Sequence, residues 1–333
     1  MKMPRHFLQT ISRRKSATEN LRAFRPFGAV SAAALLMLIP TACAQKKRAL
    51  TPADEPRVAI IAVDGKTIRT FGSFPLKRGV YADCVDALTR HSAAIIAINI
   101  LFDLPSSHGR QEDERFARAI GRAGNVILLA TADEEKIIYP IGALKKNARA
   151  VAHGEMWTGN SMRVKGIAPL ARASDKVKFI PALAFAVARE YIGVKEPMSI
   201  EGNSLAAVLL FGMPLHVLKL GNMSVPLYNG GLAKISYKGP AGSIETFSLA
   251  DVVSGKIGAE KIRGRICFVG YASPGGDHET PVGIMSGTEA QANAAITVIN
   301  HLRAKPATGF RANAAVTVIN HLRAPSPEAV KTR

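Results

Sequence analysis

Continuous apolar segments of strand length constrain the fold of this chain more than any other feature of its sequence. They are RVAIIAV (57–63), AIIAINI (94–100) and NVILLA (125–130). Strands that are apolar on both faces are typical of parallel sheets covered by helices. Between the first two segments, Val80, Cys84 and Leu88 recur at helical spacing, and Phe116 and Ile120 do so before the third. The pattern predicts a β-α-β-α-β unit with right-handed crossovers.

The rest of the chain predicts shorter elements around this unit. Pro181 is expected to open an apolar helix that reaches Ile192, and Ser248 can cap a helix at 249–253. RICFVG (265–270) is expected to close the sheet, whereas 131–178 is expected to be irregular. Short strands are predicted at 205–210, 215–219 and 233–237. We therefore expect an α/β fold with a mixed, largely parallel sheet flanked by helices, in a single large domain.

The amino-terminal segment has the layout of an export signal. Residues 26–44 carry no charge and follow a basic stretch, and Ala42-Cys43-Ala44 fits a small-residue cleavage site. The apolar segment is also about long enough to span a bilayer, so an uncleaved anchor fits it as well. We expect 1–44 to be a signal peptide or signal anchor, 45–56 a linker, and the remainder extracytoplasmic, in the periplasm.

A segment near the carboxyl end is repeated. ANAAITVINHLRA (292–304) recurs as ANAAVTVINHLRA (312–324) with one Ile-to-Val change. A helix that presents Ala295, Ile299 and Leu302 on one face fits beside the sheet, and the second copy would present the same face again. The simpler interpretation is a duplication, so that 305–333 is a duplicated helix and a disordered tail. In the alternative, the second copy competes for the groove of the first.

The positive charge of the chain does not indicate a nucleic-acid surface. The formal net charge is +19, but no basic run after residue 60 is longer than a pair, and the aromatic residues do not alternate with basic ones. We expect no nucleic-acid partner, and polyanion binding is a minor alternative. The internal cysteines, Cys84 and Cys267, form no disulfide pattern and are predicted to be core residues.

Polar residues follow the ends of several predicted strands. They are Asp64, Asn99, Asp103, Thr131, Asp133, Ser273 and Asp277. Because the carboxyl ends of parallel strands meet at one rim, where open α/β sheets bind ligands, these side chains are expected to converge. Arg78 could hold a carboxylate or phosphate over that rim in bidentate fashion. In the alternative, Asp64 and Asp103 cap turns and helix starts, and Arg78 pairs with one of them.

From this group we predict a ligand-binding site without metal or cofactor. Its predicted residues are Asp64, Arg78, Asn99, Asp103, Ser273 and Asp277. No nucleophile elbow, phosphate-binding loop or dinucleotide fingerprint occurs, so no catalytic residue is predicted. Asp277-His278-Glu279 lacks a second pair at metal-ligand spacing, and His108 and His153 are expected to be solvated in loops. The main alternative is an exported hydrolase that uses Ser273 and His278 in the loop 271–283.

The chain also resembles a known family in an ordered set of segments. ICFVGYASPGGDHETPVG (266–283), followed by GTEAQANA (287–294), resembles the closing segment of the type 2 CHASE domain, an extracellular sensory domain associated with cyclases and histidine kinases. The other similar segments are RVAIIAVDGKTI (57–68), FPLKRGVYADCVDAL (74–88), AIIAINILFDLP (94–105), FIPALAFAVAREY (179–191) and ISYKGPAGSIETFSLADVVSGK (235–256). Asn99 stands where the family usually has an acid, and Gln291 where a His is common.

The resemblance implies a non-catalytic sensory domain over 57–304 that binds a small molecule of unknown identity. It also implies a membrane cyclase or histidine kinase as the partner that receives the signal, and it leaves a homodimer open. In that family the closing helix transmits a ligand-dependent change toward the membrane, which gives the expected route of the signal.

Overall fold

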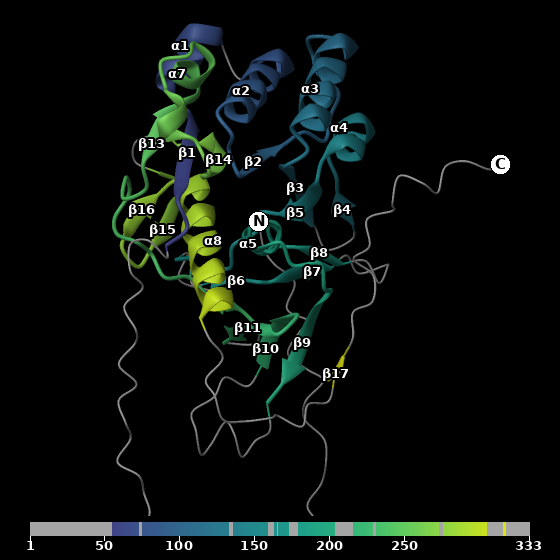
Figure 1. The fold of residues 1–333 in the computed structure, drawn as a ribbon, viewed down its shortest axis with the longest axis vertical. Coiled ribbons are helices and arrows are strands. Elements are labelled where there is room, and N and C mark those ends of the chain that lie inside the picture. Colours follow the sequence, from purple (N-terminus) through teal and green to yellow (C-terminus); the bar gives the residue numbers. More distant parts are fainter. Residues whose placement is uncertain are drawn as a thin grey trace, which may run out of the picture. The chain divides into compact units, whose positions relative to one another are not determined.

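A largely parallel sheet forms the centre of the fold (Figure 1). Its strands, in spatial order, are β13 (Thr246–Ser248), β1 (Val58–Val63), β14 (Ile266–Tyr271), β2 (Ile95–Leu101), β3 (Val126–Ala132) and β5 (Ala150–His153), and β4 (Ile137–Ile138) pairs antiparallel with β3. The structure is a computed structural model. It describes residues 55–72, 75–132, 136–158, 163–164, 166–172, 179–203, 216–228, 231–272, 276–304 and 316–317.

The predicted fold class is confirmed, and the predicted strands that fall within the described residues are present. The three apolar segments form β1, β2 and β3. Strand β1 pairs in parallel with β13 and β14, β2 with β14 and β3, and β3 with β5. The segment 265–270 forms β14, but it lies between β1 and β2 rather than closing an edge. β5 was missed because it is short and lies in the region 131–178 that was expected to be irregular.

Among the described residues, four helices supply buried side chains to the hydrophobic cluster on one face of the sheet. They are α2 (Arg78–Arg90), α3 (Arg110–Ala123), α4 (Gly142–Asn147) and α7 (Leu249–Val253). As the spacing predicted, Val80, Cys84 and Leu88 are buried on α2, and Phe116 and Ile120 are buried on α3. The short helix α1 (Gly65–Phe71) follows β1 and contacts α7.

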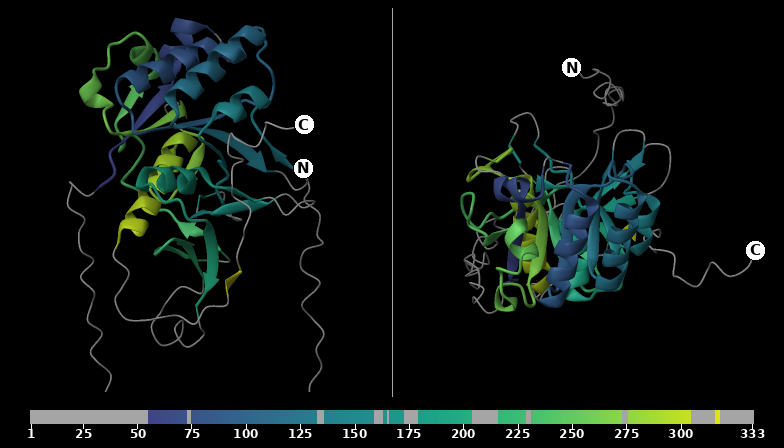
Figure 2. Two further views of the ribbon diagram at one scale, coloured as in Figure 1. Left: turned by 45° about the vertical axis from the view of Figure 1, so that its right-hand side comes forward. Right: turned by 90° about the horizontal axis from the view of Figure 1, so that it is seen from above.

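Two helices pack side by side on the other face, as both views show (Figures 1 and 2). They are α5 (Leu183–Ile192) and α8 (Gly287–Arg303). The helix predicted to start at Pro181 starts two positions later. Pro181 ends the strand β8 (Phe179–Pro181), which pairs with β7 (Leu170–Arg172). The first copy of the repeat is therefore helical, with Ala295, Ile299 and Leu302 buried as predicted.

Small antiparallel sheets complete the fold. One contains β11 (Met223–Leu227), β10 (His216–Leu220), β9 (Met198–Gly202) and β17 (Val316–Thr317), in that order. The others pair β6 (Gly166–Ile167) with β12 (Ala233–Lys234), β15 (His278–Thr280) with β16 (Gly283–Met285), and β7 with β8. The strand predicted at 215–219 is β10, and the one at 233–237 is the shorter β12. The one at 205–210 lies outside the described residues.

The second copy of the repeat does not repeat the helix at the two residues that the structure describes. Val316 and Thr317 form β17, which pairs antiparallel with Glu201 and Ile200 of β9, while the same positions of the first copy, Ile296 and Thr297, lie in α8. The prediction of helical structure is therefore wrong at these two residues. The groove beside the sheet is already filled by α8, whereas β9 offers an edge with backbone groups to pair.

The predicted signal segment 26–44 lies outside the described residues, and so does Cys43. Within the described ranges, none of the helices combines the length and apolar character needed to cross a membrane. Cys84 and Cys267 are buried free thiols, as predicted. Burial raises the pKa of Cys267 to about 12, so this thiol stays protonated and unreactive near neutral pH.

Candidate ligand-binding site

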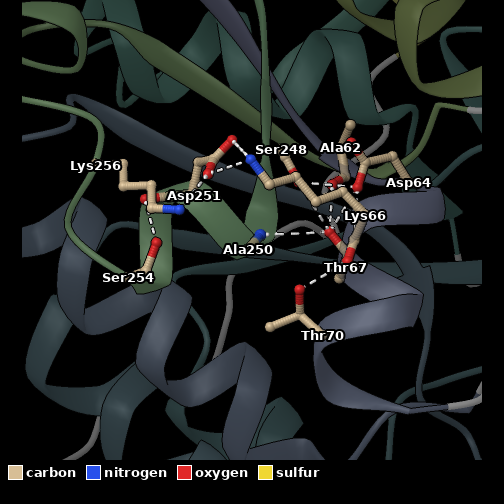
Figure 3. A network of polar contacts seen from close by, with 10 residues as sticks. All are labelled: Ala62, Asp64, Lys66, Thr67, Thr70, Ser248, Ala250, Asp251, Ser254 and Lys256. Atoms are coloured by element: carbon tan, nitrogen blue, oxygen red, sulfur yellow. Dashed lines mark hydrogen bonds and ion pairs between the residues drawn. The ribbon is translucent and has the colours of Figure 1, made fainter.

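Asp64 is fixed as the cap of a helix (Figure 3). Its Oδ1 accepts hydrogen bonds from the backbone N–H and the hydroxyl of Thr67, each at 2.8 Å, and from the Ser248 hydroxyl at 2.8 Å. Burial would raise the pKa of Asp64, but the hydrogen bonds from Thr67 and Ser248 outweigh it and hold the pKa below its usual value. The alternative interpretation, in which Asp64 caps a helix start, is confirmed.

Ser248 precedes α7 as predicted, but its hydroxyl has a different role. It donates to Asp64 and makes no capping hydrogen bond to α7. The same network links α1 to α7 through Lys66, whose Nζ lies 2.6 and 2.7 Å from the two carboxylate oxygens of Asp251 (Figure 3). Asp64 thus joins the β1–α1 segment to the β13–α7 segment.

Arg78 is engaged by groups on α3 and on the loop after β2. Its Nε lies 3.4 Å from Asp113 Oδ1, and its Nη2 donates to the Leu104 carbonyl oxygen at 3.1 Å. Its guanidinium carbon lies 4.3 Å from the centre of the Phe102 ring, a cation–π contact. The predicted pairing with Asp64 or Asp103 is wrong, because the acidic partner is Asp113.

Asn99 lies at the end of β2 and faces the first turn of α8. Its Nδ2 donates to Thr288 Oγ1 at 3.4 Å, and it is paired in register with Gly270 of β14. A Cβ at Gly270 would lie 2.5 Å from Thr288 Oγ1, so a larger residue there would force Thr288 or the start of α8 to shift. Asn99 is therefore the predicted site residue that comes closest to α8 from the central strands.

Gln291, one turn further along α8, reaches the same place. Its Nε2 donates to the Gly154 carbonyl oxygen at 2.7 Å, just past the end of β5. A Cβ at Gly154 would lie 3.3 Å from Asn99 Oδ1, which places Asn99 beside this contact. Gln291 is fully buried, and its Oε1 has no hydrogen-bond partner in the described part of the chain. We call Asn99, Gly154, Thr288 and Gln291 the rim cluster.

The other predicted site residues are distributed around the carboxyl ends of the strands. Asp277 Oδ1 accepts from the Gly287 N–H at 2.8 Å, at the start of α8, and lies 2.8 Å from His278 Nδ1. Asp103 is exposed, and the Thr131 hydroxyl donates to Glu155 at 3.1 Å. Ser273 and Asp133 lie outside the described residues. The structure thus brings Asn99 and Asp277 to the first turn of α8, whereas Asp64 and Arg78 contact α1, α7 and α3.

His153 is buried at the end of β5, so the prediction of a solvated loop residue is wrong. Its Nδ1 accepts from the backbone N–H of Glu155 at 3.3 Å, which leaves the ring proton on Nε2 in the neutral form. Burial lowers the pKa of His153 to about 4, and the backbone of Ala168 opposes that shift only in part. His108 is exposed, as predicted.

A row of buried polar residues along α8 was not predicted. Gly242 N–H donates to the Glu289 carboxylate at 2.9 and 3.1 Å, Lys238 N–H to Asn293 Oδ1 at 2.9 Å, and Ser236 N–H to Thr297 Oγ1 at 2.9 Å. These side chains recur every fourth residue and so share one helix face. We call Glu289, Asn293 and Thr297 the α8 ladder. Their spacing inside an apolar helix was the available signal.

A cavity of about 270 Å³ lies at the opposite end of the sheet from the rim cluster. Its wall includes Val58, where β1 begins, and Arg265, which immediately precedes β14, together with Ile296 of α8. The sequence predicted a site at the carboxyl ends of the strands, and nothing in it pointed to the amino ends. Within the described ranges, no group of three or more His, Cys, Asp or Glu side chains is placed to hold a metal ion.

The chain matches one family model, described as the CHASE2 domain, over residues 34–319. No curated protein and no solved structure matches it. CHASE2 domains are extracytoplasmic sensory domains that are typically non-catalytic and associate with cyclases and kinases. The matched range contains the central sheet, the rim cluster and α8.

Proposed function

This chain belongs to the CHASE2 domain family, and on that premise we propose that it binds a small molecule at the rim cluster and passes the signal to a membrane cyclase or histidine kinase. The observation that carries the proposal is the unpaired, fully buried Oε1 of Gln291. A buried acceptor without a donor is unfavourable by about 1–3 kcal/mol, so a ligand that donates a hydrogen bond to it would be stabilised there.

The lining of the rim cluster indicates the kind of ligand. Asn99, Thr288 and Gln291 are uncharged, and the Gly154 carbonyl oxygen adds another acceptor. The nearest acid of the predicted set, Asp277, is engaged by Gly287 and His278. A neutral group that donates hydrogen bonds, such as a hydroxyl or an amide, therefore fits better than a charged one.

Helix α8 offers a route for the signal. Its first turn contacts Asn99 and Asp277, and the α8 ladder holds the segment 236–242 further along the helix. Thr288 and Gln291 move with α8. A ligand that binds these side chains more tightly in one placement of α8 than in another would therefore shift α8 and that segment together. The signal would then reach a partner through the elements packed against α8.

A thermal-shift screen of the purified chain with polyols and small amides tests the proposal. We expect a ligand that raises the melting temperature of the wild type but not that of Gln291→Leu. Asn300→Leu is the matched control, since it removes a similar amide at the far end of α8. A shift that Gln291→Leu retains would place the ligand elsewhere, and an unresponsive wild type would argue against the proposal.

The membrane partner and the periplasmic location need separate tests. We expect the chain to fractionate with the periplasm or the outer face of the inner membrane, and to co-purify with a membrane cyclase or histidine kinase after cross-linking. Recovery in the cytoplasmic fraction would contradict the proposed location.

One contact favours a second candidate, the exported hydrolase. Asp277 Oδ1 lies 2.8 Å from His278 Nδ1, as the acid that orients the histidine does in acyl-transfer enzymes. Turnover of simple esters that disappears in both Ser273→Ala and His278→Ala would establish this activity in place of a purely sensory one. Absence of turnover in the wild type would exclude it for those esters.

A further inference from the structure

The cavity at the amino ends of the strands is lined by charged side chains. Arg57, Lys238, Glu245, Arg265 and Glu55 contribute to its wall, and Ile296 of α8 supplies an apolar surface. Arg57 and Arg265 immediately precede β1 and β14, which are hydrogen-bonded neighbours. Two arginine residues therefore lie next to each other at the amino ends of adjacent strands.

Arg265 has an unsatisfied donor. One of its terminal nitrogens pairs with Glu245, and its side chain is 13% exposed. Its Nε is buried without a hydrogen-bond partner in the described part of the chain. A guanidinium cannot lose its proton at accessible pH, so this N–H requires an acceptor that Glu245 does not supply.

Positive charge exceeds negative charge around the cavity. Lys238 pairs with Glu55 at 3.0 Å, and Glu245 is shared by Arg265 and by Lys261 at 3.1 Å. Burial would raise the pKa of Glu245, but hydrogen bonds from Arg265 and Lys261 outweigh it and hold the pKa below its usual value. Both carboxylates are thus already paired with cations.

Arg57 is the cation without such a partner. Its side chain is exposed and makes no ion pair among the described residues, while its carbonyl oxygen accepts from the Ile266 N–H at 2.9 Å. The backbone at Arg57 is therefore held against β14, and its guanidinium is available to a ligand.

We propose that this cavity is a binding site for a small anion that carries a carboxylate or a phosphate, with Arg57 and Arg265 as its principal ligands. Guanidinium groups match the oxygen geometry of both anions and bind them in bidentate fashion. The site lies at the opposite ends of the strands from the rim cluster, so it stands independently of the sensory function proposed above. An occupant would also contact the segment that begins at Lys238, whose backbone is held by Asn293.

Isothermal titration calorimetry of the purified full-length chain at low ionic strength tests the proposal. The probes are succinate, inorganic phosphate and, as the uncharged analogue, succinamide. We expect at least one anion to bind, succinamide not to bind, and added salt to weaken the binding. Binding of succinate alone assigns the site to carboxylates, and binding of phosphate alone assigns it to phosphates.

Substitutions locate the binding. Arg57→Gln and Arg265→Gln should each lower the affinity for the anion by about tenfold or more, because each removes a charge-assisted hydrogen bond. Arg263→Gln removes the same charge from an exposed position outside the cavity wall and should change the affinity little. Arg57 makes no ion pair among the described residues, so Arg57→Gln keeps the test valid if Arg265→Gln fails to fold.

The proposal is overturned if neither anion binds at millimolar concentration. It is also overturned if Arg57→Gln binds as tightly as the wild type, or if Arg263→Gln weakens binding as much as Arg57→Gln does. The last result would reveal a general effect of surface charge rather than a site.

Discussion

Asp64 Oδ1 accepts three hydrogen bonds, and its removal has a predictable effect on stability. Asp64→Ala removes the cap of α1 and the link to Ser248, so we expect the free energy of unfolding to fall by about 1–2 kcal/mol. Asp64→Asn keeps a capping oxygen and should lose less. The measurement is chemical denaturation, with Asp103→Ala as the control because Asp103 is exposed. A similar loss in Asp103→Ala would contradict this assignment.

The ionisation of His153 should make the stability of the fold depend on pH. Its pKa is about 4 in the folded chain and about 6.5 when unfolded, so the unfolded state binds the proton more readily. Its contribution is complete above pH 6.5 and is lost as the pH falls toward 4, by about 2 kcal/mol at pH 5.

Denaturation of the wild type and His153→Gln at pH 7 and pH 5 measures this effect. The wild type should lose about 2 kcal/mol more than His153→Gln between the two pH values, since the carboxylates are common to both. Equal losses would show that the ionisation of His153 does not matter in this range.

At the residue scale, the sequence located the polar positions but not their directions. Asp64 and Asn99 both lie near strand ends, yet Asp64 caps α1 and Asn99 faces α8. The direction depends on strand register and on which helix covers each face, and neither is local information. In the sequence, Gln291 stands out only as a departure from the family pattern. Its contact with Gly154 joins segments that are far apart along the chain, so no local pattern indicates it.

The α8 ladder allows a prediction for a whole element. Thr297→Val removes the hydroxyl that accepts from the Ser236 N–H and donates to the Asn293 carbonyl oxygen. The partly buried Ser236 N–H then loses its acceptor, so we expect a loss of about 1 kcal/mol in unfolding free energy.

Thr297→Ser is the matched control, because it keeps the hydroxyl and should retain most of that stability. Hydrogen exchange gives the local measurement: the Ser236 amide should lose protection in Thr297→Val and keep it in Thr297→Ser. If the two variants exchange alike at Ser236, the ladder does not hold this segment.

Long periodic elements were predicted from the sequence, and their order in the sheet was not. Helices α2 and α3 and strands β1 to β3 follow directly from apolar spacing. The central position of β14 is set by crossovers that pass over a neighbouring strand, and no local pattern records them. Likewise, the first copy of the repeat forms part of α8, whereas Val316 and Thr317 of the second copy form β17 on β9, and the nearly identical sequences do not record this difference.

For the molecule as a whole, deletion of 305–333 distinguishes the two interpretations of the repeat. The described contacts of this segment are those of β17, a two-residue strand on β9. Each such hydrogen bond contributes about 1 kcal/mol or less, so calorimetry should show only a small decrease in melting temperature. A large decrease would mean that the second copy is firmly docked and that the simpler interpretation is wrong.

Strand β1 lies between β13 and β14, and both come late in the chain. Among the described residues β1 has no sheet partner nearby in the sequence, so it cannot take its place between these strands until residues through Tyr271 have been synthesised. Sheets that depend on such distant pairings fold slowly. Strand β1 therefore stays unpaired with the sheet until late in synthesis, whereas β2, β3 and β5 lie close enough along the chain to pair with one another earlier.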